Sequence, residues 1–144
     1  MGTIILLENE LSFRLSIQEF DNELQNYTDI SVIEEISRDR DSRIEDSLIS
    51  SFCVMAIQIG LVELFKSWGI NPAAVAGHSV GEFVAAYTAG VLNLKDVLKI
   101  RWRHHVLMEK IAGKGKMVHI SLPLEELNDI LSLYKDRIFV SAIK

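Results

Sequence analysis

The sequence holds few of the residues that cross-link a chain or break its helices. It has one cysteine, Cys53, in 144 residues, so no disulfide can form within the chain. Cys53 lies inside an apolar helical run, where a buried thiol is far more common than a reactive one. A lone reduced thiol is typical of a reducing compartment, so we expect a cytoplasmic protein. The only two prolines, Pro72 and Pro123, each mark a predicted boundary.

An excess of positive charge is also absent. The net formal charge is −5, which gives no reason to expect nucleic acid as a partner. The charge is uneven: up to Asp46 there are 12 acidic and 4 basic residues, a net −8, and the remainder carries +3. A mildly basic surface in that remainder suits an anionic substrate or partner, although a solvated helix face is the commoner cause.

Membrane-spanning and targeting segments are not expected. We expect no apolar run to approach the roughly 20 residues of a membrane span, and residues 3–7 are too short for the core of a signal peptide. Hydrophobic residues make up 49% of the chain, enough to build a core. We expect a globular protein without a membrane partner, a metal site or a resident cofactor.

Apolar spacing predicts helices through most of the chain, separated by a charged loop over 37–47. Gly69 stands where a helix C-cap belongs, and Asn93 can cap a helix with Asp96 three residues on. The expected helices are 11–26, 30–36, 48–68, 80–90 and 93–111.

Three short segments are strand-like. Residues 73–77 read as a short buried strand that follows Pro72. Near the end, residues 116–122 and 137–144 flank a helix predicted over 123–134, which gives a βαβ unit. Two strands cannot cover both of their faces, so we expect further sequence beyond this unit.

The stretch AVAGHSVGEF places Ser79 between two glycines, in the pattern Gly-x-Ser-x-Gly. A strand before the pattern and a helix after it are the setting of a nucleophile elbow over residues 75–82. There the serine sits on a strained turn, and Gly77 and Gly81 flank it because side chains would collide with the neighbouring strand and helix. The N–H of Val80, at the start of the next helix, can stabilise an oxyanion, so the elbow predicts acyl chemistry through an acyl-serine.

A base for Ser79 is not evident among the four histidines. On an elbow the side chain of His78 points away from its neighbour Ser79. His104 and His105 lie within a helix far along the chain, and His119 lies in a predicted strand. For each of them a structural or surface role is the commoner one.

The motif Gly-His-Ser-x-Gly-Glu, with AIQIGLVELFKSWGI before it and AYTAGVLNLKDVL after it, is narrower than Gly-x-Ser-x-Gly. With these flanks the chain resembles the acyltransferase domain of type I polyketide synthases and animal-type fatty acid synthases. It is similar also to malonyl-CoA:acyl-carrier-protein transacylases. The resemblance implies an α/β fold. An α/β-hydrolase-like large subdomain would take residues 1–115, and the first βαβ half of a ferredoxin-like small subdomain would take residues 116–144.

The resemblance also implies a reaction. Ser79 would take an acyl group, usually malonyl, from coenzyme A and pass it to the phosphopantetheine thiol of an acyl carrier protein. Val80 would be an oxyanion donor, and His78 and Glu82 would complete the motif with supporting roles. Gln58 falls on a helix that the family places near the pocket, although a glutamine on a helix surface is an equally good reading. The expected partners are acyl-CoA, the carrier protein and neighbouring synthase domains.

Three departures from the family pattern stand out. The Gly-Gln-Gly segment that supplies the second oxyanion donor is absent from the sequence. The family's catalytic histidine lies roughly a hundred residues after the serine, but 65 residues follow Ser79. Malonyl-specific members carry an arginine 25 residues after the serine, where this chain has His104. Histidine lacks the bidentate fork of arginine, and Arg103 is turned away from that position by about 100°.

These departures leave three interpretations open. The chain can be part of an acyltransferase domain, active only with further sequence, that uses an uncharged starter acyl group or binds malonyl poorly. It can be part of an α/β-hydrolase such as a thioesterase, in which water accepts the acyl group. It can also be an inactive module retained for binding. For the 144 residues alone we expect no turnover, or slow self-acylation.

Overall fold

The computed structural model describes residues 2–38, 43–135 and 137–143. In that part of the chain the regular structure consists of helices. The chain divides into two compact units, residues 1–110 and 111–144, which are described separately below. The subdomain boundary predicted from the sequence, at residue 115, stays a prediction.

The described residues of the first unit form six helices, α1 (Gly2–Asn9), α2 (Leu11–Leu24), α3 (Val32–Ser37), α4 (Ser47–Ser67), α5 (Gly81–Thr88) and α6 (Leu94–Glu109). The last five confirm the helices predicted from apolar spacing. The sequence analysis missed α1, whose apolar residues follow one another without helical spacing and of which none is buried.

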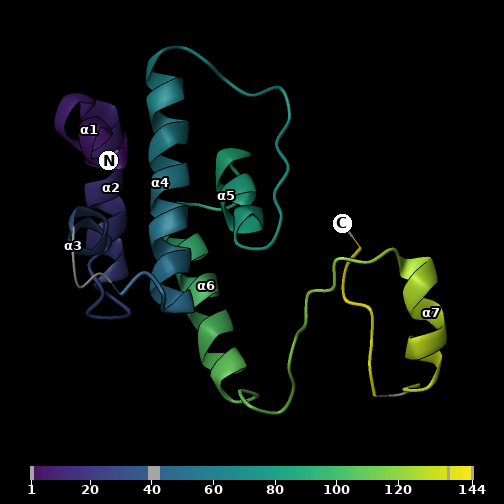
Figure 1. Cartoon of the computed structure of the whole chain (residues 1–144). Helices are drawn as coiled ribbons and strands as arrows, with labels where there is room; N and C mark the ends of the chain where they lie inside the picture. Colours follow the sequence, from purple (N-terminus) through teal and green to yellow (C-terminus); the bar gives the residue numbers. More distant parts are fainter. Residues whose placement is uncertain (1, 39–42, 136, 144) are drawn as a thin grey trace. The chain divides into compact units, whose positions relative to one another are not determined.

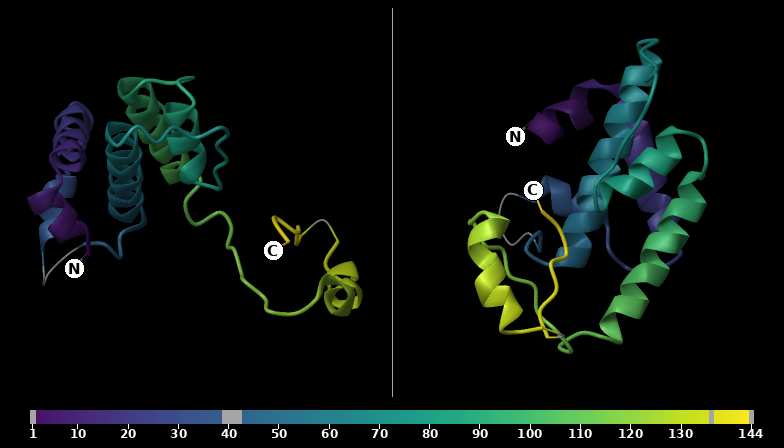
Figure 2. Two further views of the ribbon diagram at one scale, coloured as in Figure 1. Left: turned by 90° about the horizontal axis from the view of Figure 1, so that it is seen from above. Right: turned by 90° about the vertical axis from the view of Figure 1, so that its right-hand side faces the viewer.

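The core of this unit forms where α2 packs along α4. Figures 1 and 2 show α4 in the middle, with α2 on one side and α5 on the other. Phe13, Ile17 and Phe20 of α2 are fully buried at helical spacing. Gly60 of α4 permits this close packing, because a Cβ there would lie 2.7 Å from the Phe13 ring. Cys53 is buried as predicted, and burial raises the pKa of its thiol to about 11.

The expectation that no apolar run approaches the length of a membrane span is wrong for α4. Among the described residues it alone is long and apolar enough to cross a membrane, with 21 residues and a mean hydropathy of 2.0. The sequence analysis underrated this run because serine interrupts an apolar run without lowering its hydropathy much, and the only charged residues of α4 are Glu63 and Lys66. Half of the apolar stretch is buried inside the protein, as in the core helix of a folded unit.

Helix ends follow the capping residues of the sequence. The Asn93 side chain accepts a hydrogen bond of 2.9 Å from the backbone N–H of Asp96, which confirms the predicted cap of α6. After α4 the chain turns at Gly69, whose φ of +79° is the left-handed conformation that glycine adopts without strain. The backbone N–H of Ile70 then donates to the Phe65 carbonyl, which closes the helix end as predicted.

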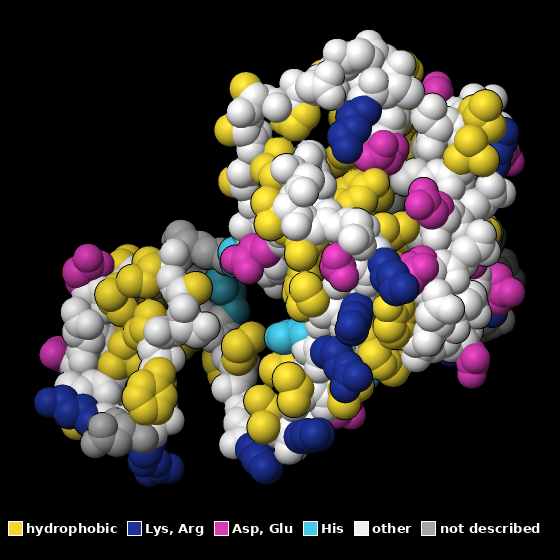
Figure 3. All heavy atoms as spheres, turned by 180° about the vertical axis from the view of Figure 1, so that it is seen from behind, with side chains coloured by type: hydrophobic (Ala, Val, Ile, Leu, Met, Phe, Trp, Pro, Cys, Tyr) yellow, Lys and Arg dark blue, Asp and Glu magenta, His cyan; other side chains and the backbone are white. Residues whose placement is uncertain are grey.

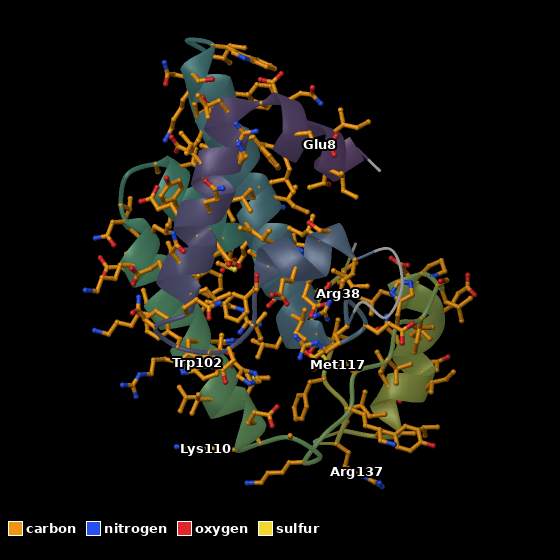
Figure 4. The ribbon with its side chains drawn as sticks, turned by 90° about the vertical axis from the view of Figure 1, so that its left-hand side faces the viewer. Glu8, Arg38, Trp102, Lys110, Met117 and Arg137 are labelled. Carbon is orange, nitrogen blue, oxygen red and sulfur yellow. The ribbon has the colours of Figure 1, made fainter. Side chains whose placement is uncertain are left out.

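Two buried polar contacts join elements of this unit. The Glu35 side chain is fully buried and accepts hydrogen bonds from Arg38, at the end of α3 (Figure 4), and from the side chain and backbone N–H of Arg43. On α6, Arg101 donates to the Ser51 hydroxyl of α4 at 2.7 Å and lies over the Phe52 ring. Together these contacts tie α3 to the segment that leads into α4, and α6 to α4 itself.

The strands predicted over 73–77, 116–122 and 137–144 are not formed in the described part of the chain. Residue 144 lies outside the described residues. A strand is stabilised by ladder hydrogen bonds to a neighbouring strand, and no such partner is described for any of the three segments. Residues 73–77 therefore run as an irregular, exposed segment between α4 and α5.

Among residues 111–135 and 137–143 of the second unit one helix forms, α7 (Leu124–Ser132), which confirms the helix predicted over 123–134. Glu125 and Glu126 lie in its first turn, where they complement the partial positive charge of the helix N-terminus. No described residue of this unit is buried, and apolar side chains, drawn yellow in Figure 3, are open to solvent on the face seen there.

Candidate active site

Ser79 lies on a strained turn between the segment 73–78 and α5. Its φ is +56°, and it is the only described residue other than glycine with a positive φ. For a residue with a Cβ this conformation is unfavourable, and it persists where the surrounding structure imposes it. Hydrogen bonds from Gly81 N–H to the His78 carbonyl and from Glu82 N–H to the Ser79 carbonyl close the turn. The side chain of Ser79 is exposed.

The first glycine of the motif is required by the backbone itself. A Cβ on Gly77 would collide with the carbonyl of Gly81 and lie 2.6 Å from the backbone nitrogen of Glu82. The sequence analysis expected the same constraint at Gly81, and there it is wrong. A Cβ on Gly81 would meet nothing within 4 Å, because this residue faces open space at the first position of α5.

One backbone donor next to the serine, at the start of the following helix, is free. Val80 is the N-cap of α5, and within the described chain its backbone N–H donates no hydrogen bond. N–H groups at a helix N-terminus favour negative charge, so this group can stabilise an oxyanion that forms next to Ser79. Glu82, in the first turn of α5, is exposed and adds the acidic residue that this helix end favours.

No described histidine forms a hydrogen bond with Ser79. His78 is exposed on the segment before the turn, and His104 is exposed on α6. His105 packs its ring 5.5 Å from the Trp102 ring. His119, in the second unit, lies with Nε2 3.3 Å from the Ser121 hydroxyl. In the described chain Ser79 therefore lies next to one unbonded backbone N–H, that of Val80, and forms no hydrogen bond with a histidine.

Gln58 of α4 lies beside the elbow. It lines a cavity of about 720 Å³ together with Gly77, His78 and Gly81. Its Oε1 atom is buried and has no hydrogen-bond partner in the described structure. The structure therefore brings Gln58 close to the motif, while His104 does not line this cavity. In the described chain no group of three or more His, Cys, Asp or Glu side chains is arranged to hold a metal.

Comparison with known proteins places these features in a family. The model of the acyl transferase domain matches residues 1–143. The chain belongs to the acyltransferase domain family. It is 39% identical over 138 residues, or 91% of the chain, to squalestatin tetraketide synthase of a Phoma species. It is also 33% identical over 129 residues, or 88% of the chain, to probable polyketide synthase 1 of Dictyostelium discoideum.

Two solved acyltransferase structures have the same fold. A loading acyltransferase from the avermectin modular polyketide synthase covers 91% of the chain with a TM-score of 0.78 and 27% identity. The acyl transferase domain of ZmaA covers 94% with a TM-score of 0.74 and 29% identity. The chain spans 42% and 32% of these two structures and 4–5% of the two polyketide synthases.

Sequence reasoning missed one group of residues around the elbow of this acyltransferase chain. The Tyr87 hydroxyl on α5 donates to Glu63 Oε1 on α4 at 3.1 Å, and Lys66 Nζ donates to the same oxygen at 2.8 Å. Glu63 and Lys66 have ordinary helical spacing, which points to a surface ion pair. Nothing in the sequence indicates that Tyr87, 24 residues after Glu63, joins them.

Proposed function

We propose that this acyltransferase chain moves an acyl group from coenzyme A to the phosphopantetheine thiol of an acyl carrier protein, through an ester on Ser79. The Ser79 hydroxyl attacks the thioester carbonyl carbon, and the carbon–sulfur bond breaks. Coenzyme A leaves as its thiol, with the proton that serine gives up. The carrier thiol then attacks the ester carbonyl and regenerates the serine hydroxyl. The proposed partners include neighbouring synthase domains in the cytoplasm.

The observation that carries the proposal is the backbone of Ser79. An exposed serine at a φ of +56°, directly before a helix N-terminus, costs conformational energy that packing alone does not require. Its hydroxyl is presented to solvent, and the free N–H of Val80 lies on the following residue. A tetrahedral intermediate on Ser79 places its oxyanion near this donor.

The proposed fold completes this arrangement. Residues 73–77 would act as the strand of a partial α/β-hydrolase-like subdomain, and residues 116–143 would form the first half of a ferredoxin-like one. The TM-scores of 0.78 and 0.74 to solved acyltransferases support this arrangement.

The rate follows from what surrounds the serine. Because no described histidine hydrogen-bonds Ser79, we expect water or hydroxide to remove its proton in the 144-residue chain. A missing general base typically slows such a step by about 10²–10⁴-fold. We therefore propose slow self-acylation whose rate rises with pH, without sustained turnover.

Mass spectrometry of the 144-residue chain incubated with acyl-CoA tests the proposal. We expect a single acyl adduct, mapped to Ser79 by peptide sequencing, and no adduct on the Ser79→Ala variant. Ser121→Ala is the matched control, because Ser121 is an exposed serine beside a histidine but on no strained turn. Labelling that persists in Ser79→Ala, or disappears in Ser121→Ala, contradicts the proposal. If the acyl group passes from Ser79 to the carrier thiol in preference to water, the chain acts as an acyltransferase and not as a thioesterase.

We further propose that the acyl group is uncharged. The residue 25 positions after Ser79 is His104, which cannot grip a carboxylate with two parallel N–H groups as arginine does. Butyryl-CoA should therefore acylate Ser79 faster than malonyl-CoA. His104→Arg should raise the malonyl rate, while His105→Arg, one position along the helix, should not. Equal preference for the two thioesters in the unmodified chain contradicts this assignment.

A further inference from the structure

The helix that follows Ser79 is weakly anchored. α5 has eight residues, and Val84 is the only one of them that is buried. Its first turn is hydrogen-bonded to the elbow through Gly81 and Glu82. The position of Ser79 and of the Val80 N–H therefore depends on the contacts that hold this short helix in place.

One side-chain cluster, here called the α4–α5 clamp and made of Glu63, Lys66 and Tyr87, supplies such a contact. Glu63 Oε1 accepts from the Tyr87 hydroxyl at 3.1 Å and from Lys66 Nζ at 2.8 Å. Lys66 Nζ also lies 5.4 Å from the centre of the Tyr87 ring. In the described chain the Tyr87 bond is the only side-chain hydrogen bond that joins α5 to another helix.

The electrostatics of the clamp favour a permanent bond. Burial, the charge of Glu63 and the hydrogen bond to Glu63 all raise the pKa of Tyr87 above its ordinary value, with a further contribution from Glu19. The hydroxyl therefore remains a donor over the whole range in which proteins are stable. Its acceptor is a carboxylate, and such charge-assisted bonds are stronger than bonds between neutral groups. Glu63 and Lys66 keep side-chain exposures of 30% and 34%, so neither charge is fully desolvated.

We propose that Tyr87 is a positioning residue for Ser79, acting through Glu63 of the α4–α5 clamp. The inference deepens the proposed acyl transfer and rests on it. α5 is a short rigid element, so a hydrogen bond near its C-terminal end fixes the direction of the free Val80 N–H at its N-terminal end. A small displacement of this donor from the oxyanion position lowers the rate of the chemical step and leaves binding of coenzyme A unchanged.

The Tyr87→Phe variant tests the inference in the 144-residue chain. It removes the hydroxyl and keeps the ring under Lys66. We expect the maximal rate of Ser79 acylation to fall about five- to tenfold, equivalent to one hydrogen bond, with the half-saturating acyl-CoA concentration unchanged. Tyr27→Phe is the matched control, because Tyr27 is also half-buried against the core but its hydroxyl bonds to no described residue. An unchanged rate in Tyr87→Phe, or an equal loss in Tyr27→Phe, overturns the inference.

Glu63 offers a second test that leaves Tyr87 itself unchanged. Glu63→Gln keeps an oxygen that accepts from Tyr87, and Glu63→Ala removes it. We expect Glu63→Gln to retain the rate within about twofold and Glu63→Ala to lose as much as Tyr87→Phe. If Tyr87→Phe lowers the thermal midpoint strongly, the comparison of Glu63→Gln with Glu63→Ala decides whether the hydrogen bond of Tyr87 positions Ser79. Equal rates in the two Glu63 variants overturn the inference.

A thiol in place of the Ser79 hydroxyl separates this inference from the proposed function. In Ser79→Cys, the N–H groups of α5 lower the pKa of the introduced thiol, so the rate of its alkylation by iodoacetamide reports how α5 is aligned. Cys53 is buried, with its pKa raised to about 11, so it contributes little background. We expect Tyr87→Phe to slow alkylation of the introduced thiol severalfold. If Ser79 never acylates but this effect is seen, the proposed function fails and the positioning role stands; if alkylation is unaffected, the positioning role fails.

Discussion

Gly77 and Gly81 lie so close together that no side chain fits on Gly77. A Cβ placed there would collide with the Gly81 carbonyl and lie 2.6 Å from the Glu82 nitrogen, where real Cβ atoms are essentially never found. The obstructing atoms are backbone, so they cannot rotate away as a side chain does. This close approach lets the chain reverse at Ser79 and enter α5 directly.

Gly77→Ala should destabilise the first unit by about 1–3 kcal/mol, the usual cost of forcing extra volume into a packed site. The turn must open to admit the methyl group, so acylation of Ser79 should also be lost. Urea unfolding followed by circular dichroism measures the first effect, and mass spectrometry measures the second.

Gly81→Ala is the matched control for stability, because a Cβ there meets nothing within 4 Å. Alanine also restricts the unfolded chain and favours helix more than glycine does. The free energy of unfolding should rise by up to about 1 kcal/mol. A loss at this position comparable to that of Gly77→Ala contradicts the asymmetry that the structure shows.

The left-handed backbone of Ser79 should cost stability that glycine recovers. Ser79→Gly relieves the strain at a φ of +56°, whereas Ser79→Ala keeps it, and both remove the hydroxyl. We expect Ser79→Gly to be more stable than Ser79→Ala by about 1 kcal/mol. Urea unfolding compares the two variants and does not depend on acylation. Equal free energies of unfolding would show that the Ser79 backbone is not strained.

The contact between Arg101 and Ser51 should be asymmetric in its energetics. Arg101 is buried, its Nε has no partner in the described structure, and its Nη2 bonds to the Ser51 hydroxyl at 2.7 Å. Ser51→Ala leaves this guanidinium without its partner and should cost about 1–3 kcal/mol. Thermal unfolding of the variant against the parent chain measures the loss.

The double variant Ser51→Ala/Arg101→Met removes the buried charge and its partner together. Replacing buried polar pairs by apolar groups of similar size is often neutral or stabilising, so the double variant should recover most of the loss. Loss of the contact between the guanidinium and the Phe52 ring should reduce that recovery by about 1 kcal/mol. A double variant that is weaker than Ser51→Ala contradicts this reading of Arg101.

The buried Glu35 carboxylate should make stability depend on acid. The backbone N–H of Arg43 holds the pKa of Glu35 below its ordinary 4.5, against the effect of burial, and the side chains of Arg43 and Arg38 add to the lowering. A carboxyl with a lowered folded-state pKa contributes stability above its unfolded pKa and loses it as the pH falls through the folded value.

Thermal midpoints measured from pH 7 down to about pH 2 check this expectation. The midpoint of the parent chain should fall in the range below about pH 4.5, which is the ordinary carboxyl range. Glu35→Gln should start lower at pH 7 and show a shallower fall. Parallel curves for the two proteins would show that other carboxyls govern the acid response.

Local patterns in the sequence predict much of this structure. Apolar residues at helical spacing locate α2 and α4, and Asn93 and Gly69 locate helix ends, because these signals depend on neighbours within one or two turns. The motif likewise locates the turn at Ser79, whose φ of +56° the structure shows, while the role of Ser79 as nucleophile stays a prediction. α1 was not predicted because its apolar residues form an unbroken run, which lacks the helical spacing on which the prediction depends.

The three predicted strands show where such local reasoning stops. A strand needs a second strand for its hydrogen bonds, and the described chain supplies none for residues 73–77, 116–122 or 137–143.

The sequence by itself determined the family, most of the helices and the position of the Gly-His-Ser-x-Gly-Glu motif, because each depends on adjacent or regularly spaced residues. Only the tertiary structure decided that Gly77, and not Gly81, is sterically required, that Gln58 lies beside the elbow, and that Glu63 joins α4 to Tyr87 on α5. Those relationships depend on how backbones approach one another in space, and no spacing along the chain encodes that distance.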